Sequence, residues 1–498
     1  MSTRSVAISQ TAEPERDEET NRSPLNAALR LLIASGVGRA GIALFAILIA
    51  ISAYVLLTYP ANFGTARWSD PSVWADNPRA APPFWTTWLG NDAISQQTWT
   101  RSEPASVSTI PAGEIRSFDF PFELDGETFP SALTVILSGL SYSGRPPVVT
   151  MTLIRPDGVK VPLANLVAPG PSPGETAPYR RFIEPAERIL LTSQPTAAQA
   201  IARVYQEQYP NAVIPTNIGD QLDRALFGRP SEIGPAGFEF VPGDYTLQVQ
   251  LILADPTDDL DQVSAILGGT VYGWMGTDTL GRDLWQGLLY GFPIALLIAT
   301  LAALASTLIG AGLGILSGYA GGTTDAIIQR ISDIVTNVPT LPLLIFLVFV
   351  LGAKLWLIIL VLVAFSWPGL TIVVRSMVLQ LRSGQLVESA RALGASRMRI
   401  MLRHVFPQVA PFIVAQMIFF APGAILAEAA LSFLGLGDTS TPTWGQMLQA
   451  GFQTGALYVG YWWWVIPPGV LIIITALAFM LLALALEPIV DPRLRNTA

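Results

Sequence analysis

The segment Glu388–Pro407, with the sequence E-S-A-R-A-L-G-A-S-R-M-R-I-M-L-R-H-V-F-P, decides the fold class of this chain. It is polar and rich in arginine, and apolar runs of membrane length flank it on both sides. Such a segment indicates a cytoplasmic loop of a membrane protein. Because Gly394 is a helix-stopping residue and Ser396 can cap a following helix, we expect two short helices that meet at a bend. The apolar or small positions at helical spacing before the bend are Leu386, Ala390 and Leu393.

Composition supports membrane insertion. The 498 residues are 51% hydrophobic and only 13% charged, with a mean hydropathy of +0.46, which is more apolar than soluble domains of this size usually are. The chain has no cysteine and one histidine, His404, so disulfides, thiolate metal sites and most transition-metal sites are not expected. A net charge of -8 argues against nucleic acid as a partner.

Six apolar segments predict six membrane spans. They are residues 40–59, 294–316, 341–352, 355–374, 412–426 and 464–486. The first could instead be a cleaved signal peptide, but the charged leader before it is long for that role and no clear cleavage site follows. We therefore interpret residues 40–59 as an anchor.

Arginine placement gives the predicted orientation. Basic residues lie before the first span, between spans four and five, and after the last: Arg22, Arg30, Arg39, Arg382, Arg391, Arg397, Arg399, Arg403, Arg493 and Arg495. With six crossings these positions share one side, which we expect to be the cytoplasm. Both termini then lie in the cytoplasm, and the long segment after the first span lies outside.

Between residues 102 and 255 of the outer segment, hydrophobic residues no longer recur at helical spacing but at every second position, which predicts β-strands. Pro156-Asp157-Gly158 is a turn signal, and the stretch after Pro242 resembles the closing strand of a β-sandwich with a tyrosine at its corner. Helical patterns at 196–208 and 221–227 interrupt the strands. We expect one small β-sandwich-like domain, either a docking surface for a partner or a decoration of the fold.

The predicted domain organisation follows from these patterns. It comprises a cytoplasmic tail (1–39), a first span (40–59), a mostly β extracytoplasmic insert (60–272), an outer amphipathic segment (273–290), a membrane core (291–487) with a cytoplasmic loop (375–410), and a cytoplasmic tail (488–498). Residues 13–19 are charge-dense and predicted to be disordered. Ser23-Pro24 is predicted to begin a short helix.

Six motifs together resemble the dipeptide/oligopeptide/nickel group of ATP-binding-cassette importer permeases, specifically its second permease subunit. They are G-T-D-T-L-G-R-D at 276–283, G-Y-A-G-G at 318–322, the loop 388–407, I-L-A-E-A-A-L-S-F-L-G-L-G at 425–437, P-T-W-G at 442–445 and D-P-R-L-R at 491–495. They stand in the family's order, and only residues 80–265 fall outside the resemblance. The resemblance implies the six-helix fold of type I importer permeases.

The resemblance also implies partners and residue roles. The expected partners are a homologous permease subunit, two cytoplasmic ATPases, an extracytoplasmic solute-binding protein and the lipid of a prokaryotic cell membrane. The loop would be the coupling helix that docks on an ATPase, through Leu386, Glu388, Ser389, Ala390, Leu393, Gly394, Ala395, Ser396 and Pro407. Ser389, His404 and Phe406 depart from the family pattern at that loop. The outer-face motif residues are Gly276, Thr277, Asp278, Gly281, Arg282 and Asp283.

Several charged or titratable residues allow more than one interpretation. Asp278, Arg282 and Asp283, placed on an amphipathic outer helix, either pair with one another or contact a delivery protein. Glu428, near the outer end of the fifth span, either lines the translocation path or reaches water at the interface. His404 has no second histidine or cysteine with which to bind a metal ion.

The sequence has no G-x-x-x-x-G-K-[ST] motif, so we expect no ATP hydrolysis by the chain itself and no cofactor in it. ATP and magnesium would be bound by the partner ATPases. The expected cargo is a short peptide, with nickel complexes and oligosaccharides as alternatives. A membrane-anchored binding or sensor protein and a proton-coupled carrier are the competing classes.

Overall fold

The computed structural model describes residues 33 and 35–490, apart from 91–92, 112, 211, 213–214, 216 and 232–236, and gives no side chains for 487–490. The described chain forms two compact units. One, called the helical unit, contains residues up to 55, 292–431 and those from 471 onward; the other, called the β-containing unit, contains 56–291 and 432–470. The interpretations placed on residues 13–19, on Ser23-Pro24 and on the last tail, 491–498, lie outside the described residues.

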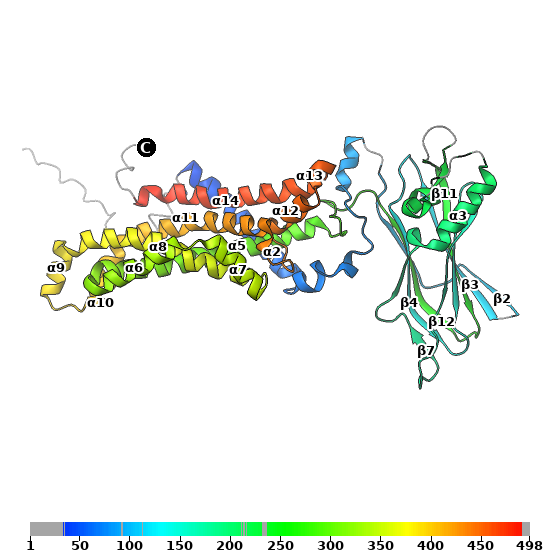
Figure 1. Ribbon diagram of the computed structural model, residues 1–498, viewed down its shortest axis with the longest axis horizontal. Coiled ribbons are helices and arrows are strands. Elements are labelled where there is room, and N and C mark those ends of the chain that lie inside the picture. The colour runs from blue at the N-terminus through cyan, green and yellow to red at the C-terminus, as the bar shows by residue number, and fades with distance from the viewer. Residues whose placement is uncertain are drawn as a thin grey trace, which may run out of the picture. The chain divides into compact units, whose positions relative to one another are not determined.

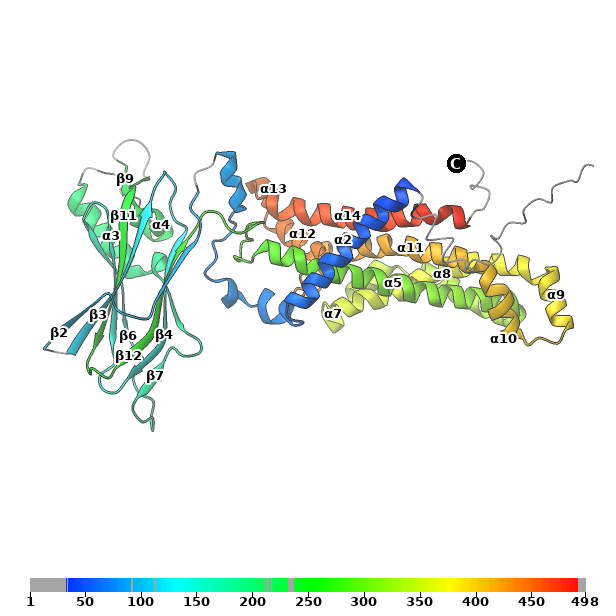
Figure 2. The same cartoon turned by 180° about the vertical axis from the view of Figure 1, so that it is seen from behind.

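Long helices make up the helical unit (Figures 1 and 2). They are α2 (Gly36–Thr58), α5 (Leu284–Ala320), α6 (Gly322–Asn337), α7 (Thr340–Leu351), α8 (Leu355–Arg382), α9 (Gln385–Ala392), α10 (Arg397–Ile400), α11 (Phe406–Leu431) and α14 (Trp462–Val490). The sequences of α2, α5, α7, α8, α11 and α14 are predominantly apolar, which is typical of helices surrounded by lipid or other helices.

Five of the described helical segments are long and apolar enough to cross a membrane, and α6 with α7 is a sixth if this bent pair is one span. The five are α2, α5, α8, the segment Arg397–Leu436, and α14 through Leu486. The predicted span 341–352 corresponds to α7, which has 12 residues and counts as a span only together with α6. It follows α6 at an angle of 76°.

Small residues bring α5 and α8 together. A side-chain carbon at Gly314 would lie 2.9 Å from the carbonyl of Thr371 and 2.8 Å from Cβ of Val374. One turn earlier, the Thr371 hydroxyl donates to the carbonyl of Gly310 at 3.0 Å. Close backbone approach with a hydrogen bond between helices is the usual means of helix association in lipid, where apolar burial gives little driving force.

Two antiparallel sheets, each five-stranded, form most of the β-containing unit. One has the path β1-β12-β4-β7 with β8 also paired to β4, and the other has the order β2-β3-β11-β5-β6 (Figure 1). The strands are β1 (Gln97–Arg101), β2 (Ser106–Ile110), β3 (Gly113–Leu124), β4 (Ala132–Tyr142), β5 (Val148–Ile154), β6 (Lys160–Val167), β7 (Tyr179–Arg181), β8 (Glu187–Leu190), β11 (Gly243–Leu253) and β12 (Asp259–Gly268). A short pair, β9 (Gly228–Pro230) with β10 (Phe238–Phe240), stands apart.

Alternate residues of both sheets face one hydrophobic core, as the period-two patterns predict. On β3, for example, Phe118, Phe120 and Phe122 are buried while Asp119 and Pro121 are not. The Pro156-Asp157-Gly158 turn was confirmed, because it joins β5 to β6 with Arg155 N donating to Val159 O at 2.9 Å. The predicted helices were also confirmed, as α3 (Pro195–Gln208) and α4 (Leu222–Phe227).

One strand assignment was wrong. The stretch after Pro242 is β11, which lies in the middle of its sheet between β3 and β5, and β12 follows it as the last strand. Its tyrosine, Tyr245, is fully buried and donates to Val241 O at 2.6 Å. A tyrosine that bonds a nearby carbonyl fixes a local corner, but strand order is set by pairing between distant segments.

Candidate functional site

The polar loop forms a bent pair of short helices at one end of the helical unit (Figures 1 and 2). We call residues 383–405 the elbow. Helix α9 ends at Ala392, and Gly394 then adopts a φ of +80°, where a residue with a side chain would be strained. Ser396 begins α10 and its side chain accepts from Arg399 N at 3.4 Å. The predicted helix stop and helix cap were therefore confirmed.

The elbow is packed onto the helices rather than hanging free. Val387 and Ala390 on α9 and Ile400 on α10 are buried. They belong to one hydrophobic cluster with residues of α5, α8 and α11: Ala311, Tyr319, Leu370, Val374, Val378, Val405, Val409 and Ile413. Because interiors are close-packed, a push on the elbow would reach these helices directly.

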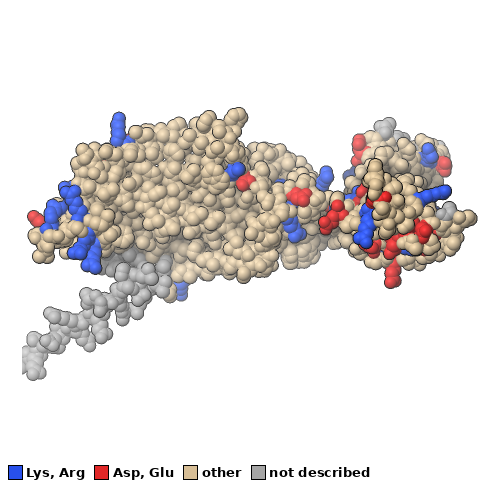
Figure 3. All heavy atoms as spheres, turned by 90° about the horizontal axis from the view of Figure 1, so that it is seen from below, with Lys and Arg blue, Asp and Glu red and all other residues tan. Residues whose placement is uncertain are grey.

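The opposite side of the elbow is exposed and partly apolar. Leu393 is 88% exposed and Leu386 is 55%. Met398 and Leu402 are exposed at 61% and 60% but line a hollow together with residues of α5 and α11. Exposed arginines surround them: Arg391, Arg397, Arg399 and Arg403. Figure 3 shows blue side chains gathered at the end of the helical unit that carries α9 and α10, beside a broad face almost without charge. Exposed apolar side chains with a basic rim are typical of a protein-binding surface.

The structure separates the predicted coupling residues into two groups. Ala390 is buried and Ala395 is half-buried, so these two hold the elbow in place. The others are exposed: Leu386, Glu388, Ser389, Leu393, Gly394, Ser396 and Pro407. Two of the departures from the family pattern, Ser389 and Phe406, are also exposed, whereas His404 is half-buried.

An ion pair that sequence reasoning missed supports the base of the elbow. Arg375 on α8 donates to both carboxylate oxygens of Asp325 on α6, at 2.5 Å and 2.6 Å. Ser317, near the end of α5, also hydrogen-bonds Asp325 and accepts from Gln329 at 3.1 Å. The signal was an acidic and a basic residue on two helices of the predicted membrane core, since such residues in membrane segments usually pair.

The outer-face motif is a loop and not a helix, so its predicted amphipathic helical character was wrong for residues 273–283. Helix α5 begins only at Leu284. Asp278 is fully buried and its Oδ1 accepts from the backbone N of Leu280 and of Arg282, both at 2.9 Å, while Oδ2 accepts from Arg282 Nε at 2.5 Å. Side-chain bonds to the local backbone compete with helix formation, which explains the loop.

The same loop ties distant segments of the β-containing unit together. Thr277, also fully buried, donates to Pro78 O at 2.6 Å and accepts from Ala81 N at 2.9 Å. The Arg282 guanidinium lies over the Trp68 ring, 4.4 Å from its centre. Since Asp278 is fully buried and pairs with Arg282, pairing within the motif is what the geometry shows for these two residues.

Asp283 closes this loop. Its Oδ1 accepts from Trp285 N and its Oδ2 from Gln286 Nε2, both at 2.9 Å. Burial raises the pKa of the Asp283 carboxyl above its usual value, against the opposing effect of these hydrogen bonds. The two glycines of the motif, Gly276 and Gly281, both have positive φ and allow the tight turns.

Glu428 lies on α11 and is only 5% exposed. Both interpretations of this residue stay predictions. Among the described residues no group of histidine, aspartate and glutamate could hold a metal ion.

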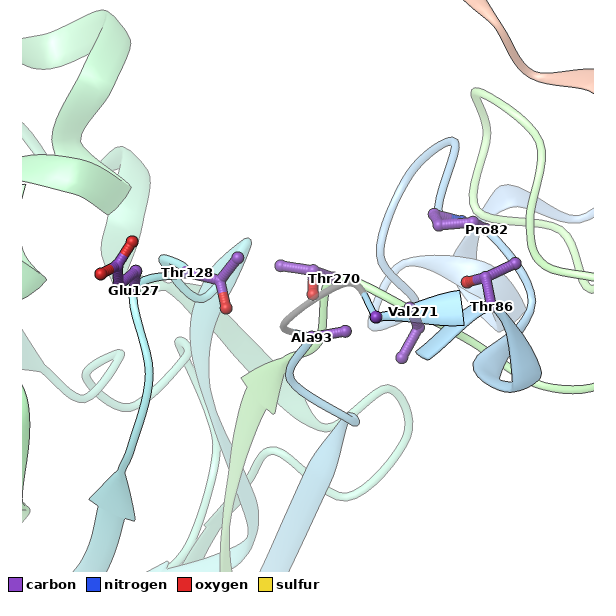
Figure 4. Close-up of a pocket in the computed structure, with 8 residues that line it drawn as sticks. Pro82, Thr86, Ala93, Glu127, Thr128, Thr270 and Val271 are labelled. Atoms are coloured by element: carbon purple, nitrogen blue, oxygen red, sulfur yellow. The ribbon is translucent and has the colours of Figure 1, made fainter. Parts of the chain in front are cut away.

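A hollow of about 540 Å³ in the β-containing unit is lined by Pro82, Thr86, Gly90, Ala93, Glu127, Thr128, Thr270 and Val271. Figure 4 shows Glu127 and Thr128 at one side and Pro82 and Thr86 at the other, without convergence on one point. This arrangement does not resemble a binding site with converging polar groups.

A comparison with protein families matches residues 310–496 to the binding-protein-dependent transport system inner membrane component. The dipeptide transport system permease protein DppC of Bacillus subtilis is 37% identical over 224 residues, which are 45% of this chain and 69% of that protein. The oligopeptide transport system permease protein OppC of the same species is 36% identical, over 45% of this chain and 72% of that protein. The inward-facing MetNI methionine ABC transporter matches 42% of this chain and 96% of that chain, with 19% identity and a TM-score of 0.34.

Several apolar helices joined by a packed, arginine-rich elbow define a multi-pass membrane protein of the permease class. The chain belongs to the family of binding-protein-dependent transport system inner membrane components, and within it is similar to the DppC and OppC permeases.

Proposed function

We propose that this chain is one of two permease subunits of an ATP-binding-cassette importer of peptides, in a prokaryotic cell membrane. The relatives named above are dipeptide and oligopeptide permeases, which favours peptides over nickel complexes or oligosaccharides. A homologous permease would complete the pathway, two ATPases would bind in the cytoplasm, and a solute-binding protein would deliver cargo outside.

In this proposal the chain crosses the membrane six times, with α6 and α7 together as one span. Both termini and the elbow face the cytoplasm, in agreement with the arginines on the elbow. The two sheets between α2 and α5 form an extracytoplasmic β-sandwich-like insert. The predicted parts 1–39, 40–59, 60–272, 273–290, 291–487 and 488–498 are retained as the domain organisation.

The observation that carries the proposal is the two-sided elbow. One side is buried against α5, α8 and α11 through Val387, Ala390 and Ile400. The other exposes Leu393 at 88%. Such an element can be held by a soluble ATPase and can transmit its motion to the helices as a rigid body. The Asp325 to Arg375 pair would keep α6 moving with α8.

The test is binding of the purified permease to its ATPase subunits after Leu393→Glu. A charged group in place of an exposed apolar contact should weaken binding by about 30-fold or more, which corresponds to about 2 kcal/mol. Leu89→Glu is the matched control, because Leu89 is 74% exposed but lies outside the helical unit. Equal binding by both variants and the unchanged protein would refute docking at the elbow.

A further inference from the structure

A pocket within the helical unit has features that the proposed function leaves unexplained. It has a volume of about 250 Å³ and is lined by three helices. Its lining residues are Ala302 and Ser306 on α5, Leu362 and Ser366 on α8, and Phe419, Phe420, Gly423, Ala424 and Ala427 on α11.

The hydroxyl group of Ser306 indicates that this pocket binds a polar ligand. Its side chain is 1% exposed, and its hydroxyl has no hydrogen-bond partner among the described residues. A buried hydroxyl without a partner costs free energy, so native structures rarely leave one unsatisfied. The Ser366 hydroxyl group belongs to the same lining.

Two prolines lie beside the pocket in sequence. Pro368 lies within α8, two residues after Ser366, and Pro422 lies within α11, next to Gly423. A proline inside a helix cannot donate to the carbonyl four residues earlier, which leaves the carbonyls of Ala364 and Ile418 short of a donor. Ala364 lies midway between the lining residues Leu362 and Ser366 in the sequence, and Ile418 directly precedes Phe419, so the pocket region combines hydroxyl groups with freed carbonyls.

The pocket lies beside the cluster that holds the elbow, since its lining residue Phe420 packs against that cluster. In this cluster, the buried residues of α8 all follow Pro368: Leu370, Val374 and Val378. Those of α11, Val409 and Ile413, precede Pro422. The segments of both helices next to the elbow thus belong to one cluster, and the two prolines lie outside it.

We propose that this pocket is a binding site for ordered water, at which α8 and α11 bend when the elbow moves. A volume of 250 Å³ exceeds the roughly 30 Å³ that one water molecule occupies in the liquid, so several fit. Water can donate to the freed carbonyls and bond the serine hydroxyls, which lipid chains cannot do. The bending rests on the proposed function, whereas the water site does not.

Hydroxyl-radical labelling of the full-length protein in lipid nanodiscs, without cargo, tests the site. Radicals generated from bound water modify neighbouring aromatic rings, so Phe419 and Phe420 should be labelled more than Phe45, which is likewise half-buried in the same unit and packs on Phe479. Gly423→Leu should remove the excess, because a side chain there meets open space in the pocket. Ser306→Ala should reduce it. Gly469→Leu, on α14, also meets open space and should change nothing.

Labelling of Phe419 and Phe420 at the level of Phe45 would mean a dry pocket and would overturn the proposal. Labelling that persists in Gly423→Leu would overturn it too, since the radicals then come from elsewhere. Protection that appears only when a peptide cargo is added would assign the pocket to cargo instead.

Peptide uptake tests the bending separately. Gly423→Leu should lose uptake while ATPase subunits still bind, and Gly469→Leu should retain both. Retained uptake in Gly423→Leu would contradict bending at this pocket. If the unmodified protein did not bind ATPase subunits at all, this result would instead count against the proposed function. Failure of the bending proposal and failure of the proposed function are therefore distinguishable.

Discussion

The β-containing unit and the helical unit are each stabilised internally in a different way. The sheets bury phenylalanine, leucine and tyrosine in one core, whereas the α5 to α8 contact depends on glycines and a threonine hydroxyl. Many leucines of the helical unit stay exposed, such as Leu360 at 54%. In water, burial of apolar area drives packing, while in lipid it does not, so close contact and hydrogen bonds replace it. The difference in packing between the two units is therefore the difference expected between a protein region in water and one in lipid.

The largest expected effect is in the sheet core. Leu247 on β11 is fully buried, opposite Phe120 on β3 and Leu153 on β5. Leu247→Ala should lower the free energy of unfolding of the β domain by about 2–5 kcal/mol, because it leaves a cavity. Leu360→Ala, the same change at an exposed position of α8, should stay within about 0.5 kcal/mol. Thermal unfolding in nanodiscs measures both, and similar losses would contradict the comparison.

The second largest expected effect comes from substituting a glycine at the contact between α5 and α8. Gly314→Leu forces α5 away from α8 and should cost about 1–3 kcal/mol or more, as overpacking does. Gly312→Leu is the matched control, since a side chain at Gly312 meets nothing within 4 Å. Chemical unfolding in mixed micelles would compare them. If Gly312→Leu were as damaging as Gly314→Leu, close approach would not be the reason.

The third effect separates backbone strain from packing. At Gly394 a side chain meets nothing within 4 Å, but φ is +80°. Gly394→Ala should therefore destabilise the bend by about 1–2 kcal/mol, seen as roughly tenfold faster amide exchange across the elbow. Gly469→Ala, in a regular helix, should instead stabilise by about 0.5–1 kcal/mol. Unchanged exchange after Gly394→Ala would show that the bend is not strained.

The smallest expected loss of stability comes from removing one hydrogen bond between two helices. Thr371→Val removes the bond to Gly310 and should cost about 0.6 kcal/mol, the average for such bonds in membranes. Ser376→Ala is the control, because the Ser376 hydroxyl bonds only its own helix, to Ile372 O at 3.0 Å, at an exposed position. A double-mutant cycle with Gly314→Ala would reveal coupling, and its absence would weaken the account of this contact.

Local signals in the sequence predicted much of this structure. The period-two pattern at residues 118–122 is a strand, and the positions of Gly394 and Ser396 end one helix and begin the next. These features depend on a few neighbouring residues and on backbone conformation. The direction of burial on α9 was less clear from sequence, because Val387 turned out to be the buried anchor while Leu386 and Leu393 are exposed.

Features that depend on distant segments could not be predicted. The motif loop is held by contacts of Thr277 with Pro78 and Ala81, about 200 positions earlier in the chain, so its helical interpretation failed. The central place of β11 depends on β3 and β5 in the same way. The Asp325 to Arg375 pair joins residues 50 positions apart. Such contacts are set by tertiary structure, which no local pattern contains.

The most direct test of the central claim uses the absence of cysteine from the chain. Leu393→Cys places a single thiol at a position that is 88% exposed on the elbow. A membrane-impermeant maleimide should label it only in inside-out vesicles, and bound ATPase subunits should block that labelling. Labelling from the outside of intact cells, or labelling that ATPase subunits do not change, would contradict the claim that the elbow is the cytoplasmic coupling element.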